Sequence, residues 1–176
     1  MKSSSVVSAL IAMSVFASFP AMSVQKCDDK KQEVTPSSRF QDNGNGTITD
    51  TQTKVTWQRC VVGMTWDGSS CTGQSLDYKY SESHTVVDEY NQKKVAKHSN
   101  WRLPTEAELA SIVESKCFNP TINLDVFPYT PQSGYWTSTE DQGLNTTRIR
   151  VMHFYNGNAY TAHQNQSWRI RLVANN

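Results

Sequence analysis

The chain has 176 residues, which is enough for one domain with a hydrophobic core of its own. It carries 17 Lys and Arg residues against 16 Asp and Glu residues, a formal net charge of +1. A nearly neutral chain lacks the positive field by which many proteins bind nucleic acid, so nucleic acid is not expected as a partner.

Residues 1–23 are predicted to be a secretory signal peptide. Lys2 precedes an apolar run at 6–19, and small residues follow that run. The run is too short to span a bilayer comfortably, so no stable membrane span is expected after cleavage. Cleavage is expected after Ser23. The alternatives are cleavage after Ala17 and an uncleaved membrane anchor. We expect export to the periplasm, the cell surface or the medium.

The four cysteines of an exported chain predict two disulfides. Three pairings are possible in principle. Cys60 and Cys71 flank a short segment rich in turn-forming residues, so a local bridge closes easily there and leaves Cys27 to pair with Cys117. No two cysteines have the short spacing of a zinc knuckle, so neither a metal site nor a cofactor is predicted.

The polar segment 24–38 is expected to be a tail held only by Cys27, with the folded domain spanning 39–176. Alternating residues at 47–49 and 55–57 predict a β-hairpin. The Asp, Asn and Gly residues before this hairpin predict a tight turn. A calcium loop is the alternative, although the acidic spacing of an EF-hand is absent. A long loop is expected to follow the hairpin.

Two helices are predicted. Residues 81–97 place apolar side chains three to four positions apart, and residues 105–116 do the same. Thr105 and Glu108 have the spacing of a capping box at the start of the second helix.

The last third of the chain predicts antiparallel strands. Residues 135–138, 148–154, 159–162 and 168–173 are rich in strand formers, and Asn156-Gly157 is a strong hairpin signal. A hairpin, two helices and a run of strands together indicate an α+β fold.

Five sequence blocks resemble the collagen-like adhesin C-terminal domain family, the Lcl domain, of secreted bacterial proteins. They are Gly46-Thr47-Ile48-Thr49-Asp50, Trp57-Gln58-Arg59-Cys60, Trp101-Arg102-Leu103-Pro104-Thr105-Glu106-Ala107-Glu108-Leu109, Tyr135-Trp136-Thr137-Ser138-Thr139 and Trp168-Arg169-Ile170-Arg171-Leu172-Val173.

The resemblance implies a C-type-lectin-like plan, in which two helices pack on antiparallel sheet. The same plan is found in formylglycine-generating sulfatase-activating enzymes. The reactive cysteine pair of those enzymes has no match here, and neither do the Glu-Pro-Asn and Trp-Asn-Asp motifs of calcium-dependent lectins. Trp101 and Leu103 would share one face of a short strand before Pro104, so they are expected to fill the core and not to form an active site.

Two pairs of arginines are candidate ligand-binding residues: Arg148 with Arg150, and Arg169 with Arg171. Each pair shares one face of a predicted strand, and neighbouring strands would join the four into a basic stripe. Arginine forks suit sulfate and carboxylate groups, and the family resemblance implies binding of sulfated polysaccharide. The alternative is pairing with acids such as Glu140 or Asp141.

Trp66 is a further candidate, because an exposed indole can stack on a sugar ring. It could equally plug its own disulfide loop. Tyr155 is another aromatic residue expected to lie in a loop. His153 and His163 are expected to face each other across the Asn156-Gly157 hairpin, as a surface pair with too few ligands for a metal.

The four histidines fall in no catalytic signature, so no catalytic residue is predicted and we do not expect an enzyme. The sequence favours a secreted binding or adhesion module for a glycan or a surface protein, and it is compatible with an oligomer. The alternatives are a structural subunit of an envelope or surface assembly and an extracellular enzyme.

Overall fold

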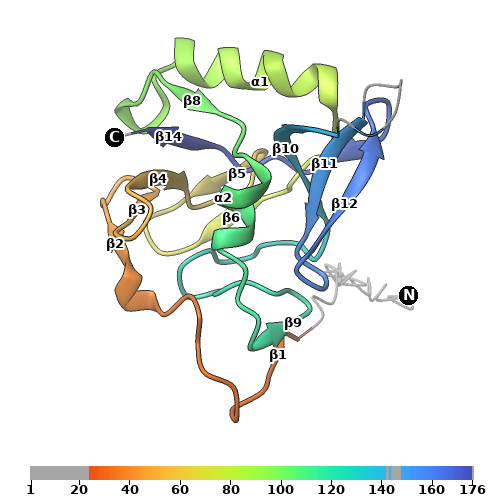
Figure 1. The fold of residues 1–176 in the computed structure, drawn as a ribbon. Helices are drawn as coiled ribbons and strands as arrows, with labels where there is room; N and C mark the ends of the chain where they lie inside the picture. Colours follow the sequence, from red (N-terminus) through yellow and green to blue (C-terminus); the bar gives the residue numbers. More distant parts are fainter. Residues whose placement is uncertain (1–23, 142, 144–147, 176) are drawn as a thin grey trace, which may run out of the picture.

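A computed structural model describes residues 24–141, 143 and 148–175 (Figure 1). The predicted signal peptide lies outside these residues. The described part is mostly sheet and loop, with two α-helices, α1 (Tyr80–Gln92) and α2 (Glu106–Ser111). None of its helices is long and apolar enough to cross a membrane.

The largest sheet has five strands in the order β2-β3-β4-β14-β8. The predicted hairpin at its centre is confirmed, since Ile48 pairs with Trp57. The last strand of the chain lies between β4 and β8, with Val173 opposite both Trp57 and Arg102. The strands are β2 (Phe40–Asp42), β3 (Thr47–Asp50), β4 (Val55–Gln58), β8 (Trp101–Arg102) and β14 (Val173–Asn175).

A second sheet has three antiparallel strands, β10 (Gly134–Glu140), β11 (Arg148–His153) and β12 (Asn158–His163). The hairpin predicted at Asn156-Gly157 is confirmed, and Gly157 adopts the left-handed conformation there. The pairing of His153 with Asn158, and of Arg148 with His163, puts the two histidines at opposite ends of the hairpin. The expectation that they face each other is therefore wrong.

Three short strand pairs complete the molecule: β1 (Lys26–Cys27) with β9 (Cys117–Phe118), β5 (Met64–Trp66) with β6 (Cys71–Gly73), and β7 (Tyr78–Lys79) with β13 (Ser167–Trp168). The expected long loop after β4 thus contains three strands. The single strand predicted at 168–173 is also wrong, because its two ends pair with different partners as β13 and β14.

Both helices are shorter than predicted. In the first, Lys94 takes a left-handed conformation after α1, and a 3-10 turn follows at Val95–Lys97. The second begins with the predicted capping box of Thr105 and Glu108 but ends at Ser111. Beyond it the carboxylate of Glu114 is buried and accepts a hydrogen bond from the Thr35 amide at 2.7 Å, so the chain bends inward instead of continuing the helix.

The N-terminal tail is attached more firmly than the sequence indicates. Both predicted disulfides, Cys27–Cys117 and Cys60–Cys71, are confirmed. The tail is also held by Glu114 and by Gln25, whose amide nitrogen donates to the carbonyl oxygens of Pro120 and Ile122. The expectation that Cys27 alone holds the tail is therefore wrong. Figure 1 shows β1 and β9 at the end of the molecule opposite α1.

The core consists of two clusters of buried apolar side chains. The first is centred on Trp57, Leu109 and Phe127, and the second on Trp101, Trp136 and Ile170. The predicted burial of Trp101 and Leu103 is confirmed, at 2% and 5% exposure.

The side chain of Arg171, between β13 and β14, is fully buried. Its guanidinium donates hydrogen bonds to the carbonyl oxygens of Gln58 and Arg59 and, at 2.6 Å, to the hydroxyl of Thr130. It also lies 4.8 Å from the centroid of the Phe127 ring. Because burial disfavours the charged form, the pKa of Arg171 is lowered to about 10, which still leaves it charged at neutral pH.

Replacing this buried arginine should weaken the fold. Arg171→Met removes the donor from three buried acceptors, and an unsatisfied buried acceptor costs about 1–3 kcal/mol. We expect the free energy of unfolding, measured by urea denaturation, to fall by about 2–4 kcal/mol. Lys93→Met is the control, because Lys93 forms only an exposed ion pair with Glu89 and should matter by less than about 0.5 kcal/mol. If the two substitutions lowered the free energy of unfolding equally, the buried guanidinium would not be a main stabilising group.

Candidate functional site

The four candidate arginines do not form a basic stripe. Arg150 forms an ion pair with Glu106 at 2.7 Å, and Arg169 forms one with Asp77 at 3.1 Å. Arg171 is buried, as described above. Arg148 is half-buried at the start of β11. The predicted stripe is wrong because β13 and β14 are separate strands. Between them, Arg169 bridges to Tyr135 of β10 and Arg171 is buried, so neither lies beside β11.

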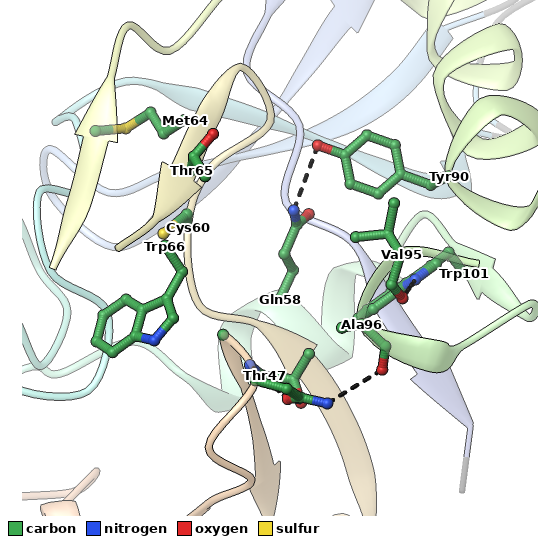
Figure 2. A pocket seen from close by; sticks show the side chains of 12 residues that line it. Thr47, Gln58, Cys60, Met64, Thr65, Trp66, Tyr90, Val95, Ala96 and Trp101 are labelled. Atoms are coloured by element: carbon green, nitrogen blue, oxygen red, sulfur yellow. Dashed lines mark hydrogen bonds between the residues drawn. The ribbon is translucent and has the colours of Figure 1, made fainter. Parts of the chain in front are cut away.

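Trp66 is half-buried on β5. The guanidinium of Arg59 lies 4.3 Å from its ring centroid, and Arg59 is held there by an ion pair with Asp42 at 2.6 Å. Trp66 therefore has one face covered, while it also lines a pocket with Gln58 (Figure 2).

A second hollow lies at the end of the β11–β12 hairpin, where it meets β13. We call it the aromatic cleft. Its lining residues come from three separate parts of the chain and are Gln132, Ser133, His153, Tyr155, Asn156, Tyr160 and Trp168.

His153 occupies the centre of the aromatic cleft. Its ring lies edge-to-face with Tyr160 at 5.1 Å and with Trp168 at 4.9 Å between centroids. The amide of Asn156 donates to the hydroxyl of Tyr160 at 2.8 Å and so fixes that ring. Beneath them, a Cβ atom on Gly134 would lie 2.7 Å from Trp168, so only glycine permits this packing.

The most exposed rings of the cleft are those of Tyr155 and Tyr160, which are 54% and 45% exposed. The expectation of an exposed Tyr155 is confirmed. The sequence did not single out Tyr160 and Trp168 as site residues. Tyr160 could have been found, because it lies three residues after the predicted Asn156-Gly157 turn. Trp168 could not be assigned, because its position beside His153 depends on the pairing of β13 with β7.

The aromatic cleft is electrically neutral. In the part of the chain that the structure describes, no Asp, Glu, Lys or Arg side chain lines it. Burial lowers the pKa of His153, so its imidazole is uncharged at neutral pH. The Trp168 indole nitrogen is buried without a hydrogen-bond partner. Such a site offers flat apolar rings and uncharged hydrogen-bonding groups to a ligand.

The described residues also contain no group of three or more His, Cys, Asp or Glu side chains that could hold a metal ion. The groups that the cleft presents are therefore aromatic rings, amides and hydroxyls.

Residues 46–174 match the Lcl C-terminal domain family. The chain belongs to this family. The matched region contains the whole aromatic cleft, whereas the tail with Cys27 lies before it. No curated protein matches the chain. The relationship of this Lcl domain to C-type lectins and to sulfatase-activating enzymes stays a prediction.

The lowered pKa of His153 should make the stability of the Lcl domain depend on pH. As pH falls from neutral through the ordinary histidine value of 6.5, the unfolded chain takes up a proton that the folded cleft resists. Stability is therefore lost toward acid pH, and His153→Gln should remove this part of the loss. The measurement is the free energy of unfolding by urea at pH 7.5 and at pH 5.5. The loss between the two pH values should be smaller for the variant than for the wild type.

His163→Gln is the matched control, since His163 is exposed at the far end of β12. It should retain the full pH dependence of the wild type. If His153→Gln behaved in the same way as His163→Gln, burial of the cleft histidine would not be the cause.

Proposed function

We propose that the protein is an exported, adhesion-related binding module whose aromatic cleft recognises a neutral glycan. The family membership supports an extracellular, adhesion-related module, and the two disulfides suggest export. The observation that carries the glycan assignment is the packing of His153 between Tyr160 and Trp168, beside the exposed ring of Tyr155.

The chemistry of the aromatic cleft suits a sugar. Aromatic rings stack on the C–H faces of sugar rings, and the amides of Gln132 and Asn156 can pair with hydroxyl groups. A sulfated glycan is less well matched, because no basic side chain of the described residues lines the cleft and Arg150 and Arg169 already have acidic partners.

We also propose that recognition occurs without catalysis. General base catalysis by histidine usually relies on a carboxylate or similar group that orients the ring. His153 instead has aromatic rings on either side, and burial lowers the pKa of its imidazole, which makes it a weaker base. Its role in the proposal is to support Tyr160 and Trp168 and to offer one hydrogen bond.

The test is binding of the oxidised chain to an array of neutral and sulfated oligosaccharides at low and high salt. We expect salt-insensitive binding to neutral glycans, since no ion pair is involved. Tyr155→Ala should weaken it about tenfold, in line with the roughly 0.5–1.5 kcal/mol of an aromatic contact plus the lost buried area.

Tyr129→Ala is the matched control, because Tyr129 is similarly exposed at 48% but does not line the cleft. It should bind as the wild type does. Binding confined to sulfated glycans and lost at high salt would contradict the proposal, and no binding to any glycan would favour a protein partner or an assembly role.

A further inference from the structure

We propose that the pocket between Gln58 and Trp66 is a second binding site, for a small uncharged molecule that donates a hydrogen bond. This inference does not rest on the aromatic cleft, with which the pocket shares no lining residue. The polar anchor is the side-chain carbonyl oxygen of Gln58.

The pocket is formed where three distant parts of the chain meet. The first part is the turn before β3 together with the first residue of that strand, which contribute Asn45 and Thr47. The second runs from Gln58 at the end of β4 to Trp66 on β5, and the third runs from α1 to β8. Its volume is about 240 Å³, which is room for a small organic molecule and not only for one water.

Gln58 is 7% exposed, and Figure 2 shows its side chain pointing toward the Tyr90 hydroxyl. Its amide nitrogen donates to the Tyr90 hydroxyl over a long 3.4 Å. Its amide oxygen is buried and has no hydrogen-bond partner. Buried polar atoms are almost always paired, so this acceptor indicates a donor that a ligand would supply.

The wall opposite is held in place before any ligand arrives. Ala96 and its neighbours Lys94 and Lys97 adopt left-handed conformations that are unfavourable for residues other than glycine. Two hydrogen bonds hold this segment: Asn45 donates to the Ala96 carbonyl at 3.1 Å, and the Trp101 indole donates to the Val95 carbonyl at 3.0 Å. A wall ordered in advance lowers the entropy lost on binding.

The other lining groups exclude an ion as the ligand. As far as the chain is described, neither Asp, Glu, Lys nor Arg lines this pocket. Met64, Val95 and the Trp66 indole supply apolar surface, while Thr47 and the Tyr90 hydroxyl supply uncharged polar groups. A mostly apolar pocket with few polar groups selects a ligand by the position of its donor, which here is a polyol hydroxyl or an amide N–H.

The experiment follows the indole N–H signals of Trp66 and Trp101 by NMR while methyl glucoside or N-methylacetamide is added to the oxidised chain. The first probe carries hydroxyl donors and the second carries an amide donor. Comparing them shows which kind of donor the pocket binds. We expect one of them to shift both indole signals in a saturable manner.

Gln58→Met keeps the size of the side chain and removes the unpaired oxygen. We expect it to weaken probe binding at least tenfold while leaving the urea midpoint unchanged or raised, since no strong bond is lost. Tyr155→Ala is the control and should bind the probe as the wild type does, so the two sites can fail independently. Binding that survives Gln58→Met, or no shift with either probe, would overturn the proposal.

Discussion

The fold depends on the course of the last nine residues that the structure describes, 167–175. This segment pairs with β7 through β13 and then with both β4 and β8 through β14. Between these strands, the carbonyl of Ile170 accepts from the Val62 amide and that of Leu172 from the Gln58 amide. Trp168 at the start of the segment packs against His153, and Arg171 in its middle binds the backbone after β4. One stretch of chain thus contacts both core clusters, the aromatic cleft and the backbone of Gln58.

The buried charge of Arg171 explains why this segment runs as it does. Its acceptors are uncharged, so its desolvation is offset by hydrogen bonds and by the Phe127 ring instead of by a carboxylate. An arginine that must satisfy several acceptors at once fixes their relative positions. The residues that resembled a ligand-binding stripe in the sequence therefore act mainly within the fold, as the ion pairs of Arg150 and Arg169 also indicate.

Local signals in the sequence were sufficient for much of the fold. The hairpin at Asn156-Gly157, the capping box at Thr105 and the disulfide between Cys60 and Cys71 each depend on a few neighbouring residues, and each is confirmed. Apart from the Cys27–Cys117 disulfide, contacts between distant segments could not be predicted. The burial of Arg171 depends on Thr130, 41 residues away, and the inward turn of Glu114 depends on Thr35, 79 residues away. The aromatic cleft belongs to this second class.

The aromatic cleft and the Gln58 pocket share a chemistry that the sequence did not suggest. Among the described residues no charged side chain lines either of them, and both combine aromatic rings with amide groups. The most direct test of glycan recognition at the aromatic cleft is an NMR titration of the tryptophan indole signals with a neutral oligosaccharide selected on the array. We expect the Trp168 signal to shift while those of the buried Trp57 and Trp136 do not. A response confined to the backbone around Arg148 and Arg150, with Trp168 unchanged, would contradict it.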